Sequence, residues 1–190
     1  FTGETTVTEE YTVAAGESSS DLTVGLFSLS AGSLKDASLY DADLSLPVGA
    51  NLADNAAFIV DGNAPGAFTT GSVLPVGVTV NTAYWNGTNL TLSVTTPIAA
   101  DASLVGGVLQ IIGRTDLGND YENLGSEDTI QTSGVNKTLS ITAEQLESLD
   151  GFGEGDYIYI SAIITDVAGN STTGTASAAI LVVDQEAPTI

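Results

Sequence analysis

The chain has 190 residues and a formal net charge of −21, from 24 Asp and Glu against 3 Lys and Arg. Binding to a phosphate backbone or to an anionic lipid surface depends on Lys and Arg, so this charge excludes nucleic acid and anionic membranes as partners. His and Cys are absent, which removes imidazole and thiolate metal ligands and the usual nucleophile–base pairs of catalysis. Apolar residues make up 43% of the sequence, enough for a core, and no apolar run is long enough to span a bilayer.

The first third of the chain carries short extended patterns separated by clusters of Gly, Ser and Asp. This pattern predicts strands joined by turns, and no stretch holds a helical period for three turns. The predicted strands are residues 5–13, 22–29, 44–48 and 56–60. Because a two-sheet sandwich needs about seven strands, this segment predicts only part of a β domain.

The rest of the chain predicts a fuller set of strands, spaced by turn signals as in a β-sandwich. They are residues 78–85, 89–96, 104–112, 129–132, 137–141, 157–165 and 175–183.

Two local patterns in this second part are specific. Ile158, Ile160, Ala162 and Ile164 alternate with polar or aromatic residues, which predicts a half-buried strand with the Ile face inward. Thr142 and Gln145 have the spacing of a capping box, so a short helix over residues 143–149 is expected, ending before Gly151.

A short motif occurs twice, each time after an apolar run. It reads VDGNAP at residues 60–65 and VDQEAP at residues 183–188. Pro cannot donate to a strand ladder and ends the strand before it. Repeats at long spacing indicate modules in an array, so each copy is interpreted as a last strand followed by an acidic joint to the next module. The alternative is two unrelated strands that both stop at Pro.

The turn after the strand at 157–165 carries a family resemblance. Its sequence DVAGN at 166–170, followed by a last strand ending in VDQEAP, resembles the bacterial immunoglobulin-like domains of large repetitive surface adhesins of the RTX type. The stretches YWN at 84–86, PIAADASL at 97–104 and YENLG at 121–125 are similar to the same family. The resemblance extends over residues 64–188. It implies an all-β chain of tandem immunoglobulin-like sandwiches.

The resemblance also implies how the modules divide. Residues 1–63 resemble the C-terminal half of one domain, through YTVAAGE at 11–17, KDA at 35–37 and ADLSLP at 42–47, with SLY at 38–40 in place of the usual AGN. Residues 64–186 form one complete domain, and residues 187–190 begin the next module or a linker. Either residues 1–63 belong to a longer polypeptide that supplies the missing strands, or a neighbouring copy of the chain donates them. The remaining alternative is a small, self-sufficient sheet.

Calcium at the joints between domains is what the resemblance implies. In an immunoglobulin-like sandwich the entry strand and the loops after the second and sixth strands share one end. Carboxylate, amide and carbonyl oxygens there suit Ca²⁺, which takes six to eight oxygen ligands. The candidate metal ligands are Asp61, Asn63, Asp101, Asp166 and Asn170, with Asp184 in the second joint. The alternative is that Asp166 and Asn170 only stabilise their own turn. Acidic loops at 116–120 and 150–156 lie at the opposite end, as a second calcium site or, more simply, as solvated loops.

We therefore expect a non-enzymatic, extracellular, cell-surface module that acts mechanically, with no catalytic residues. Its partners are neighbouring immunoglobulin-like modules or copies of the same chain, without direct membrane insertion. One alternative is a filament subunit assembled by strand donation. Another is a carbohydrate-binding module, in which Trp85 and Tyr84 would stack on a sugar. A hydrolase would need an acid pair in a cleft, and Glu9/Glu10 and Asp41/Asp43 are better explained as solvated strand edges or turns.

Overall fold

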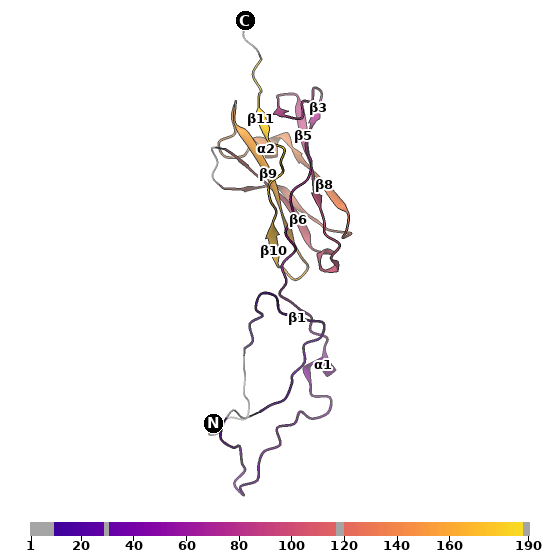
Figure 1. Cartoon of the computed structure of the whole chain (residues 1–190), viewed down its shortest axis with the longest axis vertical. Helices are drawn as coiled ribbons and strands as arrows, with labels where there is room; N and C mark the ends of the chain where they lie inside the picture. The colour runs from indigo at the N-terminus through magenta and orange to yellow at the C-terminus, as the bar shows by residue number, and fades with distance from the viewer. Residues whose placement is uncertain (1–9, 29–30, 117–119, 188–190) are drawn as a thin grey trace. The chain divides into compact units, whose positions relative to one another are not determined.

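The computed structural model describes residues 10–28, 31–116 and 120–187, in two compact units, Phe1–Asn63 and Ala64–Ile190 (Figure 1). We call these unit 1 and unit 2 and describe each by itself. The fold is all-β, as the sequence predicts, and unit 2 contains most of the sheet structure. No helix in the described part has the length and apolar character to cross a lipid bilayer.

Unit 2 contains two sheets. The larger has the strand order β4-β11-β9-β6-β7, with β10 also paired to β9. Its strands are β4 (Tyr84–Trp85), β6 (Val108–Thr115), β7 (Glu122–Thr129), β9 (Tyr157–Thr165), β10 (Ser171–Thr173) and β11 (Leu181–Val183). The smaller sheet has the order β3-β5-β8, with β3 (Val73–Gly77), β5 (Asn89–Pro97) and β8 (Asn136–Thr142). Neighbouring strands are antiparallel in both sheets except for β4 and β11, which are parallel.

The inner faces of the two sheets form a single hydrophobic core, so unit 2 is a β-sandwich (Figure 1). Leu92 and Val94 of β5 contribute from the smaller sheet, and Leu109 and Ile111 of β6 from the larger. Trp85 is completely buried and is the largest fully buried side chain. Because burial of apolar area stabilises a fold by about 25 cal/mol per Å², this shared core is the main stabilising element of unit 2.

Two local predictions are confirmed in unit 2. Ile158, Ile160, Ala162 and Ile164 are all buried on the inner face of β9. Helix α2 (Ala143–Glu147) begins with the complete capping box, in which Thr142 accepts from the Gln145 N–H and the Gln145 side chain accepts from the Thr142 N–H. The helix ends at Glu147, before the predicted boundary at 149. Leu146, on its buried face, packs into the core.

Other predicted elements of unit 2 differ from the structure. Residues 78–83 are not a strand, because Asn81 bends the chain by accepting from the Ala83 N–H at 3.1 Å. Leu104 belongs to a short 3-10 helix, η1 (Ala102–Leu104), and not to β6. Of the predicted strand at 129–132, only Thr129 is in a strand, at the end of β7. Strand β11 covers only the end of the predicted range 175–183. Strands β3 and β10 were not predicted.

Unit 1 has far less regular structure than the sequence predicts. Its described elements are β1 (Ser18–Ser19), helix α1 (Leu52–Asn55) and β2 (Val60–Asp61), and β1 pairs with β2. The predicted strands over residues 10–13, 22–28, 44–48 and 56–59 are absent, and residues 5–9 and 29 lie outside the described residues. The physical reason is the lack of partner strands: an extended segment needs a neighbour to receive its N–H and C=O groups.

Local hydrogen bonds give the described part of unit 1 its shape. Gly62 lies close to the turn at residues 14–17, donating to the Glu17 carbonyl and accepting from the Gly16 N–H, both at 2.7 Å. A side chain at Gly62 would meet the Ala14 carbonyl oxygen at 2.5 Å. Further along, Asn51 both donates to and accepts from the Val24 backbone, at 2.9 Å each. None of the described residues of unit 1 is buried, so the described part of this unit forms no hydrophobic core.

Candidate functional site

The turn from Asp166 to Asn170 follows β9 and is built around the Asp166 carboxylate. Its Oδ1 accepts from the backbone N–H of Ala168 and of Asn170, both at 2.9 Å, and its Oδ2 accepts from the Asn170 side-chain amide at 3.0 Å. Asp166 is only 4% exposed. Gly169 has a φ of 95°, a left-handed conformation that Gly adopts without steric cost. Asp166 and Asn170 therefore stabilise their own turn, which was the alternative to a metal site.

Asp101 lies in a second loop at the same end of unit 2. As the N-cap of η1, its Oδ1 accepts from the N–H of Ser103 at 2.9 Å and from the Ser103 hydroxyl at 2.8 Å. The carbonyl of Ser103 in turn accepts from the Val167 N–H at 3.1 Å. This bond joins the Asp101 loop to the Asp166 turn, so the structure brings these two loops together.

The entry of the chain into unit 2 is also close to this end. The Pro65 carbonyl accepts from the Thr172 hydroxyl at 2.6 Å, and Thr172 pairs with Ile164 near the end of β9. Asp61 and Asn63 belong to unit 1, where Asp61 Oδ1 accepts from the Asn63 N–H at 3.1 Å. They lie in a different unit from Asp101 and Asp166.

The oxygen ligands in the Asp101 and Asp166 loops are of the type that Ca²⁺ binds. Their arrangement meets the requirements of a calcium site only in part. Asp101 and Asp166 supply carboxylates, which are hard ligands of the kind that Ca²⁺ prefers. Each carboxylate has about four lone-pair positions, and among the described residues the hydrogen bonds to the Asp101 carboxylate fall on Oδ1 alone. Across the described ranges, however, no three Asp or Glu side chains gather closely enough to hold a metal by themselves.

Asp184 lies at the opposite end of unit 2, beyond β11. Its N–H donates to the Trp85 carbonyl at 2.8 Å, so its backbone extends the parallel pairing of β4 and β11. The next residue, Gln185, donates its N–H to Glu154 at 2.7 Å and its side-chain amide to Glu147 at 2.8 Å. Asp184 is thus separated from Asp101 and Asp166 by the length of β9. Of the acidic loop at 116–120, residues 117–119 lie outside the described residues.

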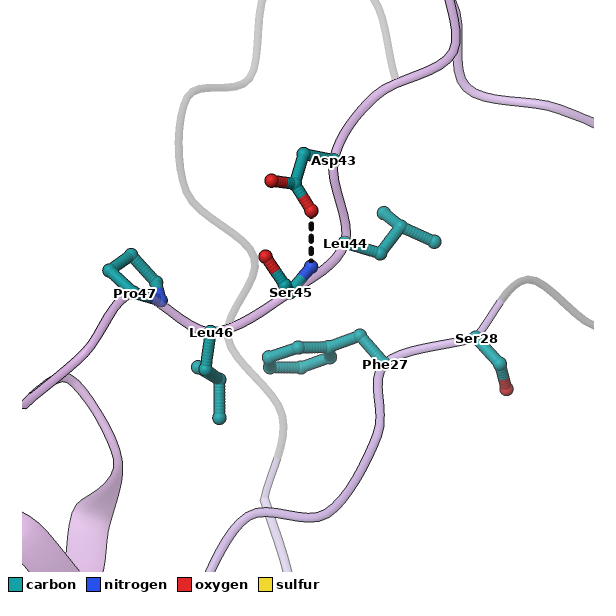
Figure 2. A pocket seen from close by; sticks show the side chains of 7 residues that line it. All are labelled: Phe27, Ser28, Asp43, Leu44, Ser45, Leu46 and Pro47. Carbon is teal, nitrogen blue, oxygen red and sulfur yellow. Dashed lines mark hydrogen bonds between the residues drawn. The ribbon is translucent and has the colours of Figure 1, made fainter.

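Of the pairs considered for hydrolysis, Asp41 and Asp43 both lie within the described residues, and each makes a local contact. Glu9 lies outside the described residues, and Asp41 forms an ion pair with Lys35. Asp43 lines a shallow hollow of unit 1 with Phe27, Leu46 and neighbouring residues (Figure 2). Hydrogen bonding by the Ser45 side chain, and then by its backbone N–H, lowers the pKa of Asp43. The pKa of Asp43 is therefore shifted in the opposite direction from the raised pKa that a general acid needs.

One cluster in unit 2 was not predicted from sequence. The guanidinium of Arg114 lies 4.4 Å from the ring centre of Tyr159 and 5.5 Å from that of Tyr121. Arg114 is on β6 directly opposite Tyr159 on β9, on the outer face of the larger sheet. The alternation of Tyr157 and Tyr159 with inward Ile residues could have indicated an outward aromatic face, but the cross-strand register with Arg114 could not be inferred from sequence.

Comparisons with protein-family models, with curated proteins and with solved structures found no match.

Proposed function

We propose that this chain is a non-enzymatic, load-bearing spacer module of an extracellular cell-surface adhesin or filament. The immunoglobulin-like character of its units and its place in a tandem array belong to this proposal. Its support is physical: an acidic surface, a β-sandwich core and the routing of the chain through unit 2.

The observation that carries the proposal is that the chain enters and leaves unit 2 at opposite ends of β9. Pro65 is bonded next to the Thr165 end of β9, through Thr172. Val182 of β11 pairs with Tyr157, at the other end of the same strand. Nine residues of β9 correspond to about 30 Å at the usual rise per residue. Modules with this routing join in series and transmit tension along their strands.

The pairing of the two terminal segments is suited to tension. Residues near the entry pair in parallel with Thr175: the Thr70 N–H donates to the Thr175 carbonyl, and the Thr175 N–H donates to the Phe68 carbonyl, both at 2.9 Å. Near the exit, Val182 and Asp184 donate to Ala83 and Trp85 of the parallel strand β4, at 3.0 and 2.8 Å. Opposite pulls on the two ends load these bonds in shear, so they share the force and do not break one after another.

Calcium at the joints is part of the proposal. The net charge of −21 produces self-repulsion that a bound cation reduces. Asp101 and Asp166 supply carboxylates in neighbouring loops, with Asp61 and Asn63 preceding the entry of unit 2 and Asp184 following its exit. Ca²⁺ bound only to the folded chain stabilises it by about 2.7 kcal/mol at a concentration a hundredfold above its Kd.

Force spectroscopy tests the mechanical role. Because the chain has no Cys, Ala64→Cys with Glu186→Cys provides unique handles at the two ends of unit 2. A control pair, Ala64→Cys with Val167→Cys, pulls from two points at the entry end and peels strands apart. We expect a several-fold higher unfolding force for the first pair. Equal forces for the two pairs would contradict a load-bearing role.

A second candidate function is a filament subunit assembled by strand donation between chains. The observation that favours it is unit 1, where the described residues include no buried side chain and β1 and β2 have two residues each. Exposed apolar side chains and unpaired strand edges favour pairing with another chain. Sedimentation of the purified chain distinguishes the two: ordered polymers support donation, and a monomer at all concentrations contradicts it.

A further inference from the structure

Aromatic side chains gather on the outer face of the larger sheet of unit 2. Val182 of β11 lies between Tyr84 of β4 and Tyr157 of β9 in the strand register. Residues directly opposite one another across paired strands share a face. Tyr159 follows Tyr157 by two positions and therefore shares that face. Three tyrosines therefore share this face, although Tyr84 is far from the other two in sequence.

The surface formed by these residues and Arg114 is accessible. Tyr84 is 38% exposed, Tyr121 37% and Tyr157 46%. Arg114 and Tyr159 are half-buried, consistent with the stacking of the guanidinium on the Tyr159 ring at 4.4 Å. We call this surface, made of Tyr84, Tyr121, Tyr157, Tyr159, Val182 and Arg114, the tyrosine face.

Arg114 has no carboxylate partner among the residues that the structure describes. Within the described ranges, the ion pairs are Lys35–Asp41 and Lys137–Asp128. The nearest acidic residue along the strand, Asp116, uses its Oδ1 to accept from the Tyr157 backbone N–H at 3.0 Å. Among the described residues, Arg114 donates a single hydrogen bond, from Nη1 to the Thr115 carbonyl at 3.2 Å. A guanidinium has five N–H donors, so most of this donor capacity remains for solvent or a ligand.

We infer that the tyrosine face binds a neutral glycan made of hexopyranose units. Aromatic rings that are fixed in a sheet offer flat apolar area for the C–H face of a sugar ring, with little loss of side-chain entropy. Arg114 donates hydrogen bonds to sugar hydroxyls, and its stacking on Tyr159 fixes its orientation before a ligand arrives. Asp116 and Asp184, at the margin of the face, supply acceptors for the hydroxyl protons.

The charge of the chain selects a neutral glycan over an acidic one. At −21, the long-range field repels uronate, sulfate or phosphate groups. Arg114 is a lone positive charge on the face, and it is already balanced in part by the negative faces of two tyrosine rings. A neutral ligand meets no such repulsion and uses the same Arg donors. The inference adds a ligand site to the spacer proposed above and does not depend on its mechanical role.

Nuclear magnetic resonance titration of the full chain tests the inference. The probes are the hexasaccharides of cellulose, starch and mannan, with an oligogalacturonate as the acidic comparison. We expect saturable shifts of the tyrosine ring signals with at least one neutral probe. Tyr157→Ala is expected to weaken this binding at least tenfold, Arg114→Lys to weaken it because the planar donor is lost, and Tyr157→Phe to retain it.

The matched control is Tyr40→Ala, which removes a tyrosine of unit 1 that is 74% exposed. It is expected to leave the titration unchanged. Spectra of each variant without ligand show whether unit 2 keeps its fold, and Arg114→Lys carries the test if Tyr157→Ala unfolds. The absence of saturable shifts with all neutral probes would overturn the inference, as would binding unaffected by Tyr157→Ala or binding of the oligogalacturonate alone.

Discussion

The indole Nε1 of Trp85 donates a hydrogen bond to Oε1 of Glu147 at 3.0 Å, and the Gln185 amide donates to the same oxygen at 2.8 Å. One carboxylate oxygen therefore joins β4, the end of helix α2 and the segment that leaves unit 2. Trp85 is fully buried, so its N–H depends on this acceptor.

Replacement of Glu147 by Ala is expected to lower the free energy of unfolding by about 1–3 kcal/mol, because a buried indole N–H would lose its partner. Glu147→Gln keeps a carbonyl acceptor and is expected to cost less. Glu144→Ala, in the same helix at an exposed position, is the matched control. Urea denaturation followed by Trp85 fluorescence measures all three, and equal stability of Glu147→Ala and wild type would contradict the expectation.

Gly113 is a second position at which a substitution is expected to destabilise unit 2. A Cβ there would lie 2.6 Å from Cδ1 of Leu124 and 3.2 Å from Cδ1 of Ile160. Gly113→Ala is therefore expected to cost about 1–3 kcal/mol through overpacking of the core. Gly87→Ala adds its methyl group to open space and is expected to have little effect. Thermal unfolding of both variants checks this, and a Gly113→Ala variant as stable as Gly87→Ala would refute it.

One substitution can distinguish the role of Asp166 in calcium binding from its role in stabilising the turn. Asp166→Asn keeps an oxygen that accepts from the Ala168 and Asn170 N–H groups but loses the negative charge. We expect this variant to fold and to bind calcium more weakly than wild type in isothermal titration of the chelator-treated chain. Asp101→Asn is expected to behave in the same way. No heat of binding by wild type, with no calcium-dependent rise in melting temperature, would exclude the calcium proposal.

The ion pair between Lys137 and Asp128, at 2.7 Å, predicts a dependence of stability on pH. The hydrogen bond from the Lys137 side chain lowers the pKa of Asp128. A lowered carboxyl pKa stabilises the folded chain above the unfolded pKa of about 3.9. This contribution is lost as the pH falls through the lower folded value.

Lys137→Met should therefore reduce stability slightly at pH 7 and have no such effect at a pH below both pKa values. The difference at neutral pH is small, because both side chains are partly exposed. Melting curves of the two proteins across this range measure it, and the carbon resonance of the Asp128 carboxyl group reports its pKa directly. An Asp128 pKa that is the same in both proteins would contradict the prediction.

Elements of unit 2 could be predicted where a single sequence pattern, such as alternation or a capping box, dominates. Alternation at Ile158–Ile164 and the capping box at Thr142 and Gln145 each have a single simple interpretation, and both are confirmed. Strand β3 was missed because Pro75 interrupts its apolar run, although Pro is compatible with an edge strand. Strand β7 was largely missed because it is mostly polar; its Leu124 is buried, and charged side chains protect a sheet edge from pairing.

The arrangement of the candidate site depends on contacts that no sequence pattern encodes. The spacing of D-x-A-G-N predicts the turn around Asp166, whereas the bond between Ser103 and Val167 arises from the packing of two distant loops. In unit 1 the extended patterns were visible in sequence, but a pattern does not identify the strand that will pair with it. The tyrosine face could not be predicted for the same reason, because it depends on the register between β6 and β9.

The absence of buried side chains from the described part of unit 1 has a thermodynamic consequence. The heat-capacity increment of unfolding arises from newly hydrated apolar surface, at about 12–15 cal/mol/K per residue in globular proteins. Residues whose side chains are already hydrated in the native chain contribute little to it. A calorimetric scan of the isolated monomer should therefore give one transition whose heat-capacity increment corresponds to the length of unit 2 and not to all 190 residues.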